Sequence, residues 1–207
     1  MQILYIFLFI VISYLVGSIP NGYIIGKIFR KIDIREHGSS NMGATNIARV
    51  MGKQYAAIVF ILDAFKGAAV IVFVRILMSY DLKFGMELGK VFINNNLFIY
   101  IYPLYGIFAV LGHVYPVYLK FKGGKAVATG VGAAMAMAFL IGLIGIFVFL
   151  IVFLIFRYAS LASLYGTATV FILMMFYDIF LAKEIFVFAY NYHHNNWLIY
   201  LLEYTSI

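Results

Sequence analysis

The chain contains no cysteine among its 207 residues. Disulfide bonds, a thiolate nucleophile and a metal site with cysteine ligands are therefore excluded. Charged residues are also scarce, at 11% compared with roughly 25% in a typical soluble domain. Hydrophobic residues instead make up 65% of the chain. This composition predicts an integral membrane protein that forms a single membrane-embedded domain over residues 1–207.

Long apolar runs alternate with short polar segments, and about 20 residues suffice to cross the hydrocarbon core of a bilayer. We expect an all-α, polytopic helical bundle with five to seven transmembrane helices. The run Val127–Phe156 is too long for one upright helix, so it is either one tilted span or two short spans with a turn near Gly142 or Gly145. The other expected spans are Gln2 to about Gly26, Tyr55 to Met78, Leu97 to Tyr115, Tyr158 to Leu181 and, with mixed composition, Ile185 to Ile207.

The basic residues are placed unevenly and give the chain a net charge of +7. One cluster extends from Lys27 to Lys53, and a second extends from Lys120 to Lys125. Basic loops beside transmembrane helices face the cytoplasm, so this placement predicts an orientation in the membrane and argues against a nucleic acid partner. We expect both clusters on the cytoplasmic side and the N-terminus outside. With an odd number of spans, the C-terminus lies beside the two clusters.

The first polar segment, Arg35–Asn46, lies between two long apolar runs. Its glycines allow tight turns and expose backbone N–H groups, which bind anions. Arg49 follows closely, and its planar guanidinium suits phosphate oxygens. A phosphorylated substrate at the membrane surface is therefore the expected ligand. The candidate substrate-contacting residues of this segment are Ser39, Asn41, Gly43, Thr45 and Asn46.

A second polar segment combines lysines with two adjacent glycines beyond the end of an apolar run. Adjacent glycines let N–H groups converge on an anion, and lysines add positive charge. The segment differs from an ATP-binding P-loop, which requires glycine at the position of Leu119 and serine or threonine at that of Ala126. The candidate binding residues in and near this segment are His113, Lys122, Gly123, Gly124 and Lys125.

Asp63 and Lys66 are ionisable residues inside an expected span, where charge is costly and is usually paired or functional. Their spacing of i and i+3 puts both on one helix face, so we expect them to pair with each other or to orient a loop residue. His193 and His194 have no carboxylate close in sequence that completes a metal site. We therefore expect neither a metal nor a cofactor.

Two extended motifs resemble those of the bacterial acyl-phosphate:glycerol-3-phosphate acyltransferases, the PlsY family. The resemblance covers about residues 1–135 without large gaps, and the two motifs are long and specific together. The residues that carry it are Gly17–Pro20, Asp33–Ser39, Asn41–Asn46, Arg49, Leu62–Asp63, Lys66–Gly67, Gly112–His113, Pro116, Phe121–Lys125 and Val127–Thr129.

This resemblance implies transfer of an acyl chain from acyl phosphate to the 1-hydroxyl of glycerol 3-phosphate. The products are 1-acylglycerol 3-phosphate (lysophosphatidic acid) and phosphate, in the first acylation of phospholipid synthesis. An acyl phosphate is already activated, so the enzyme mainly needs positioning and charge stabilisation, and a substrate phosphate can accept the hydroxyl proton. The resemblance further implies a multi-pass enzyme of the bacterial inner membrane, linked to an enzyme that forms acyl phosphate. A monomer is sufficient for this scheme.

The third motif of the family, near the C-terminus, is matched only in part. The family has a histidine, an asparagine three residues later, and then a basic residue. His193 and Asn196 fit this spacing, whereas Ile199 takes the basic position. Ser40 and Ala126 also depart from the family, which usually has glycine at both, and an added Cβ restricts positive φ. By resemblance, the catalytic set is Ser39, Arg49, Lys125, His193 and Asn196.

Two other functions fit parts of the sequence. In a small membrane transporter for a phosphorylated metabolite or anion, the basic loops would be gates, but such transporters usually contain an internal repeat, and none is evident. A CDP-alcohol phosphotransferase needs several aspartates grouped on helices to bind metal, whereas this chain has isolated ones. The acyl-chain preference does not follow from the sequence.

Overall fold

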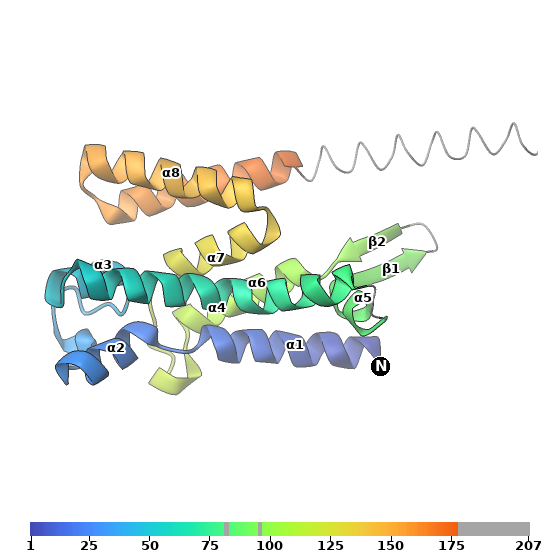
Figure 1. Ribbon diagram of the computed structural model, residues 1–207, viewed down its shortest axis with the longest axis horizontal. Helices are drawn as coiled ribbons and strands as arrows, with labels where there is room; N and C mark the ends of the chain where they lie inside the picture. Colours follow the sequence, from blue (N-terminus) through green and yellow to red (C-terminus); the bar gives the residue numbers. More distant parts are fainter. Residues whose placement is uncertain (81–82, 95–96, 178–207) are drawn as a thin grey trace, which may run out of the picture.

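The computed structural model describes residues 1–80, 83–94 and 97–177, and these residues form an elongated, mostly helical bundle (Figure 1). Two short 3-10 helices, η1 Ile34–Glu36 and η2 Val117–Leu119, lie in the polar loops. One small hairpin pairs the strands β1 Lys90–Asn94 and β2 Leu97–Tyr100. The α-helices are α1 Gln2–Gly17, α2 Asn21–Arg30, α3 Ala44–Val50, α4 Lys53–Ser79, α5 Lys83–Gly89, α6 Tyr102–Val114, α7 Val127–Met137, α8 Phe139–Phe156 and a further helix at Ala159–Tyr177.

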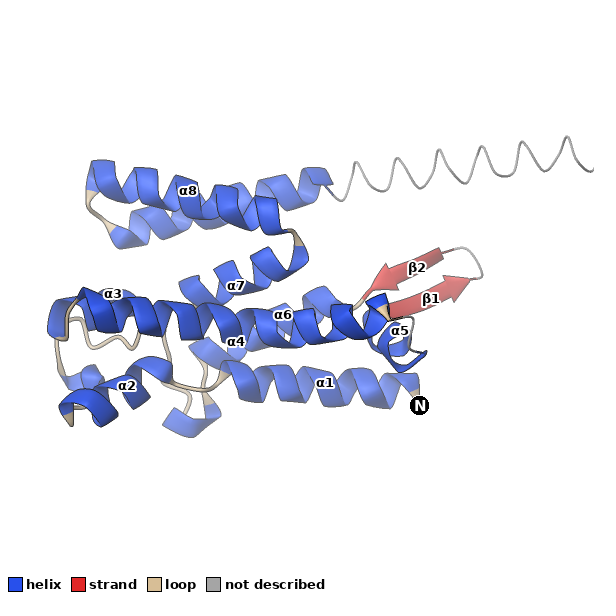
Figure 2. Ribbon diagram, in the orientation of Figure 1, coloured by secondary structure: helices blue, strands red, loops and turns tan. Residues whose placement is uncertain are grey.

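The bundle is arranged in layers around α4. Helices α1 and α6 pack together on one side, α7 packs against α4, and α8 with the helix Ala159–Tyr177 forms a separate layer beyond α7 (Figure 2). Glycine permits the closest approaches: a Cβ added at Gly17 would lie 2.1 Å from the carbonyl oxygen of Ala109, and one at Gly132 would lie 1.8 Å from that of Ala64. Small residues at helix contacts are typical of membrane bundles, in which packing rather than hydrophobic burial drives association.

The structure confirms the predicted all-α membrane bundle. Within the described residues, four helical segments are long and apolar enough to cross a bilayer: Gln2–Arg30, Lys53–Ser79, Phe139–Phe156 and Ala159–Tyr177. The first is broken into α1 and α2 at Pro20, which cannot donate a backbone hydrogen bond. The predicted span Ile185–Ile207 lies outside the described residues.

Two predicted details are wrong. The long apolar run does break into two helices, α7 and α8, but the break falls at Ala138 rather than near Gly142 or Gly145. The predicted span Leu97–Tyr115 begins with β2, and helix α6 starts only at Tyr102. Pro103 in the first turn favours a helix start there, whereas the β-branched and aromatic residues before it suit a strand.

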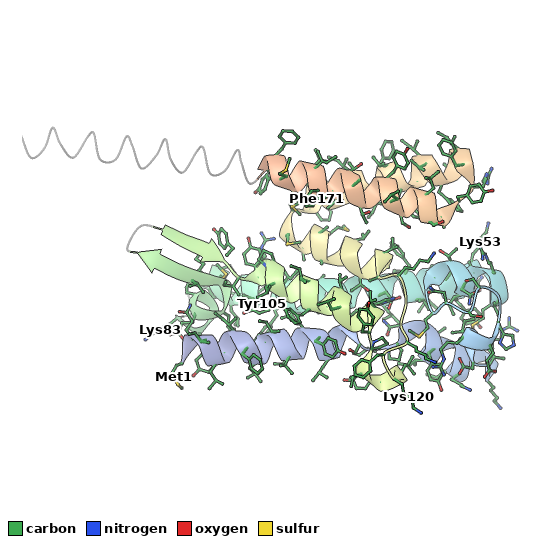
Figure 3. All side chains as sticks on the ribbon, turned by 180° about the vertical axis from the view of Figure 1, so that it is seen from behind. Met1, Lys53, Lys83, Tyr105, Lys120 and Phe171 are labelled. Carbon is green, nitrogen blue, oxygen red and sulfur yellow. The ribbon has the colours of Figure 1, made fainter. Side chains whose placement is uncertain are left out.

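The two polar loops lie at the same end of the bundle. Figure 3 shows Lys53 and Lys120 towards one end, and Met1 and Lys83 at the opposite end. This agrees with the prediction that both basic clusters share one side of the membrane. It also brings Arg35–Asn46 and the residues around Lys125 close enough to form one site.

Candidate active site

The first polar loop folds around the side chain of Asn46, which is 1% exposed. Its Oδ1 atom accepts a hydrogen bond from the backbone N–H of Ser39 at 2.8 Å. Its Nδ2 atom donates to the carbonyl oxygens of Asn41 at 2.8 Å and His37 at 3.0 Å. A single buried amide therefore replaces regular secondary structure in closing the loop, and it holds Ser39 at the loop surface.

The start of the loop is fixed by Asp33 and Arg35. Oδ1 of Asp33 caps η1 by accepting from the backbone N–H of Arg35 at 3.0 Å, and Oδ2 lies 2.6 Å from the guanidinium of Arg35. Hydrogen bonding from the Arg35 side chain lowers the pKa of Asp33 to about 2. The Arg35 guanidinium also lies over the Tyr23 ring, 5.0 Å from its centroid. This cation is committed to the scaffold rather than to a ligand.

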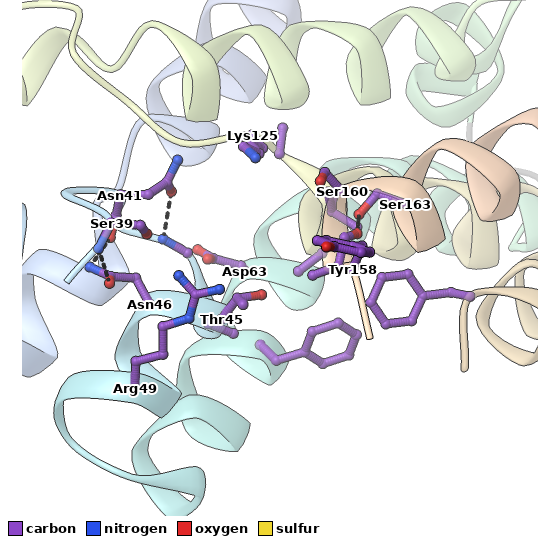
Figure 4. A pocket seen from close by; sticks show the side chains of 18 of the residues that line it. Ser39, Asn41, Thr45, Asn46, Arg49, Asp63, Lys125, Tyr158, Ser160 and Ser163 are labelled. Atoms are coloured by element: carbon purple, nitrogen blue, oxygen red, sulfur yellow. Dashed lines mark hydrogen bonds between the residues drawn. The ribbon is translucent and has the colours of Figure 1, made fainter. Parts of the chain in front are cut away.

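A polar cavity of about 240 Å³ opens beside this loop (Figure 4). Arg49, from α3, and Lys125, from the second loop, enter it from different parts of the chain, and both side chains are exposed. Among the described residues, neither forms a salt bridge with a carboxylate. The other polar residues that line the cavity are Ser39, Asn41, Thr45, Asn46, Asp63, His113, Arg157, Tyr158, Ser160 and Ser163.

Asp63 lies at the cavity wall and is 2% exposed, and its negative charge is paired with the ammonium group of Lys66. Its Oδ1 atom lies 3.0 Å from Nζ of Lys66 and accepts a hydrogen bond from Nδ2 of Asn21 at 2.9 Å. Lys66 also donates to the carbonyl oxygen of Ile19 at 2.6 Å, at the break between α1 and α2. The predicted i, i+3 ion pair is thus confirmed. Because Asp63 is already paired, the charge left for a ligand in the cavity is positive.

His113 is held beneath the glycines of the second loop. Its Nδ1 atom is 3.1 Å from Oγ1 of Thr129, and its backbone carbonyl accepts from the N–H of Gly124 at 3.1 Å. Its buried Nε2 atom has no hydrogen-bond partner among the described residues, and a Cβ at Gly124 would lie 2.3 Å from it. Close packing against the imidazole therefore requires glycine at position 124.

The adjacent glycines of the second loop pack against the end of α6, outside the polar cavity. Lys122, Gly123 and Gly124 are not among the residues that line the polar cavity. A Cβ at Gly123 would lie 2.1 Å from the His113 carbonyl oxygen, so this glycine allows the loop to approach the end of α6. Their direct contact with substrate stays a prediction, and the geometry favours positioning of Lys125 instead.

Ser40 and Ala126 both adopt left-handed backbone conformations, each with φ of 57°. These are the two positions at which the sequence departs from the glycines usual in the PlsY family. Ala126 immediately precedes α7 and lines the cavity. The side chains at these positions are therefore accommodated with backbone strain.

Sequence reasoning missed the contribution of the turn between α8 and the next helix. Arg157 and Tyr158, from this turn, and Ser160 and Ser163, from the helix that follows, line the same cavity as Arg49, and Arg157 ends α8 with φ of 59°. One signal was available: Arg157 is the only charged residue between Lys125 and Asp178. The predicted catalytic residues His193 and Asn196 lie outside the described residues, so their roles stay predictions.

An apolar groove of about 720 Å³ adjoins the polar cavity. It lies between α6 and α7 on one side and α8 with the helix Ala159–Tyr177 on the other. Val127, Phe149 and Ser163 line both spaces, so the groove and the cavity meet at these residues. A cationic cavity that continues into an apolar groove inside a membrane bundle is suited to a ligand with a phosphate head and a hydrocarbon tail.

Comparisons with known proteins identify the family. The family model of glycerol-3-phosphate acyltransferase matches residues 7–203. A glycerol-3-phosphate acyltransferase of Acholeplasma laidlawii is 45% identical over 174 residues, which are 84% of this chain and 71% of that relative. One of Staphylococcus haemolyticus (strain JCSC1435) is 45% identical over 158 residues, 75% of this chain and 72% of that relative. The chain belongs to the glycerol-3-phosphate acyltransferase family and is a multi-pass membrane enzyme.

Solved structures of the same family share the fold. The glycerol 3-phosphate form of PlsY, an integral membrane glycerol 3-phosphate acyltransferase, superimposes with a TM-score of 0.70 at 34% identity, over 87% of this chain and 84% of that one. Its lysophosphatidic acid form gives a TM-score of 0.69 at 34% identity, over 87% and 83%. The predicted resemblance to the PlsY family is confirmed, and it selects the acyltransferase over the transporter and the phosphotransferase.

Proposed function

We propose that this enzyme uses acyl phosphate as its donor and transfers the acyl chain to the 1-hydroxyl of glycerol 3-phosphate. The new ester bond forms as the acyl–phosphate bond breaks, and phosphate leaves with the hydroxyl proton. One observation carries the proposal: Arg49 and Lys125 converge, unpaired with carboxylates among the described residues, on a cavity that opens into an apolar groove. Both substrates carry phosphate, and the donor carries a hydrocarbon tail.

The chemistry of the donor fits the side chains that are present. Phosphate is a good leaving group, so an acyl phosphate needs alignment and stabilisation of developing charge more than it needs a strong nucleophile on the enzyme. The cations Arg49, Lys125 and Arg157 suit that task. In the same scheme a substrate phosphate accepts the hydroxyl proton. We do not assign this role to His113, because its Nε2 atom lies against Gly124.

The residues then divide by role. Arg49 and Lys125 bind phosphate oxygens, and Arg157 and Ser160 add polar groups to the same cavity. Asn46 positions the first loop. His193 and Asn196 keep their predicted catalytic roles. The polar groups that contact substrate are Ser39, Asn41, Gly43 and Thr45.

The relatives support the choice of substrates. Solved forms of PlsY contain glycerol 3-phosphate in one case and lysophosphatidic acid in the other. Lysophosphatidic acid has a phosphate head and one acyl chain, the combination for which the cavity and groove of this chain are suited. The acyl chain of the donor and the acyl chain of the product would then occupy the same groove.

We further propose a bacterial inner membrane location with both polar loops in the cytoplasm. The basic residues support this orientation, because positive loops remain on the cytoplasmic side. In this proposal the activity is functionally linked to an enzyme that forms acyl phosphate. Residues 1–207 act as one membrane-embedded domain. A monomer is sufficient in this proposal, because the polar cavity and the apolar groove are both formed by one chain.

The donor is tested with protein purified in detergent, glycerol 3-phosphate and either palmitoyl phosphate or palmitoyl-CoA. We expect lysophosphatidic acid from palmitoyl phosphate, with little product from the thioester and no loss of rate in EDTA. A rate with palmitoyl-CoA that exceeds the rate with palmitoyl phosphate would contradict the donor assignment. Activity that disappears in EDTA and returns with Mg²⁺ would contradict the metal-free mechanism.

A further inference from the structure

Gly130 lies inside helix α7, and apart from its chain neighbours and the backbone of its own helix, no described residue comes within 4 Å of the position that a Cβ would take there. The other glycines that line the apolar groove differ. A Cβ at Gly145 would lie 2.3 Å from Cγ2 of Val170, and one at Gly106 would lie 3.0 Å from Cδ1 of Ile71. At those positions glycine is explained by the helix that packs against it. At Gly130 the described protein provides no such reason.

Glycine within a helix is less stable than alanine, because it loses more backbone freedom on folding. Open space beside Gly130 means that alanine would fit without a clash. A glycine that is neither needed for packing nor favoured by helix propensity indicates that the space itself is used. The occupant is then something that the described residues do not supply.

The two faces of α7 show where that space leads. One face is packed on α4, where Gly67 and Gly132 allow contact with backbone carbonyls across the interface. The other face lines the groove through Val127, Gly130 and Val131. Val127 belongs to both the cavity and the groove, and Gly130 is three residues further along, a rise of about 4.5 Å. A chain that runs from the cavity into the groove therefore passes close to Gly130 near the junction of the two spaces.

We propose that Gly130 is a specificity-determining residue that keeps the entrance of the groove wide enough for the acyl chain of the donor. The inference rests on the proposed function and deepens it, since it names the residue that admits a long hydrocarbon tail. A larger side chain at this position projects into the groove close to the reacting carbonyl. It then excludes the first methylenes of a long chain and leaves the phosphate-binding residues untouched.

The experiment compares Gly130→Leu and Gly130→Ala with the wild type, using palmitoyl phosphate as the long donor and acetyl phosphate as the short donor, because an acetyl group has no methylene to enter the groove. Ala57→Leu is the matched control, because Ala57 is exposed on α4 and lines neither space. Each buried methylene strengthens binding about fourfold, so exclusion of two methylenes costs more than about tenfold. We expect the ratio of kcat/KM for the long donor to that for the short donor to fall at least about tenfold in Gly130→Leu and less in Gly130→Ala. The KM for glycerol 3-phosphate should not change, and the thermal unfolding midpoint should not fall.

Three results would go against this assignment. A ratio that stays unchanged, with or without an equal loss for both donors, would mean that Gly130 does not shape the acyl path. A lower unfolding midpoint in Gly130→Leu with a donor-independent loss would mean that another part of the protein fills the space. If the wild type used neither acyl phosphate, the proposed donor itself would be wrong, and that outcome is distinct because it is seen before any variant is compared.

Discussion

The side-chain oxygen of Asn46 accepts a hydrogen bond from the backbone N–H of Ser39 at 2.8 Å, across seven residues of chain. This bond joins the start of α3 to the loop that precedes it. Because the same amide also donates to the carbonyls of Asn41 and His37, the conformation of the loop depends on one side chain. Asn46 was predicted to bind substrate, and the structure supports a positioning role for it at the cavity wall.

Asn46→Ala is expected to lower the thermal unfolding midpoint in detergent and to raise the KM for glycerol 3-phosphate. The change leaves buried backbone groups without partners, which costs about 1–3 kcal/mol. Asn46→Asp keeps the acceptor for Ser39 but loses both donors, so it should give only partial recovery. Gln54→Ala removes an exposed amide and serves as the control. Wild-type KM and midpoint in Asn46→Ala would contradict the positioning role.

Ser40→Gly should stabilise the protein, because serine at φ of 57° is strained and glycine is not. We expect a gain of up to about 1 kcal/mol, limited by the greater freedom of glycine in the unfolded chain. Ala126→Gly should act in the same direction. Ala48→Gly, inside α3, should instead destabilise by about 1 kcal/mol and shows that the effect depends on φ. A lower unfolding midpoint for Ser40→Gly would argue against strain at this turn.

Lys66→Met is expected to be strongly destabilising, because it leaves the carboxylate of Asp63 buried without its ion-pair partner. Breaking a buried pair from one side typically costs about 3–5 kcal/mol. The unpaired carboxylate would also face the cavity and repel phosphate, which raises the KM for glycerol 3-phosphate. The double variant Asp63→Asn, Lys66→Met removes both charges and should recover much of the stability. No recovery in the double variant would mean that the pair does more than neutralise its own charge.

The orientation in the membrane is measurable because the chain has no cysteine. Ser40→Cys places a thiol in the first polar loop, and Lys83→Cys places one at the opposite end of the bundle. A membrane-impermeant thiol reagent added to intact cells should label only the variant at position 83. Labelling at position 40 in intact cells, with none at position 83, would reverse the proposed topology.

The sequence predicted the features that depend on local pattern. Apolar runs of sufficient length located the helices, and the i, i+3 spacing of Asp63 and Lys66 predicted their ion pair, because both follow from helix geometry alone. The concentration of Ser39, Asn41, Thr45 and Arg49 between two spans located one wall of the cavity. The concentration of lysines and glycines in the second loop likewise predicted Lys125 as a residue of the site, and Lys125 lines the cavity.

The features that the sequence did not predict depend on contacts between distant segments. The break at Ala138 interrupts an apolar run without a polar signal, and strand β2 occupies the start of the predicted span Leu97–Tyr115. Gly123 and Gly124 also allow the loop to approach His113, which lies about ten residues earlier in the chain, and this packing role does not follow from the local sequence. The contribution of the turn at Arg157 to the cavity also follows only from the folded arrangement.

The most direct test of the phosphate-binding cavity is steady-state kinetics of Arg49→Ala and Lys125→Ala with palmitoyl phosphate and glycerol 3-phosphate. Lys53→Ala is the control, since Lys53 is an exposed cation at the same end of the bundle and does not line the cavity. Loss of one charge-assisted contact costs about 1.5–3 kcal/mol, so kcat/KM should fall about 10- to 150-fold in each cavity variant. The control should keep wild-type values, and Arg49→Lys should be poorly tolerated because lysine lacks the planar fork. Wild-type kinetics in correctly folded Arg49→Ala and Lys125→Ala would contradict the account.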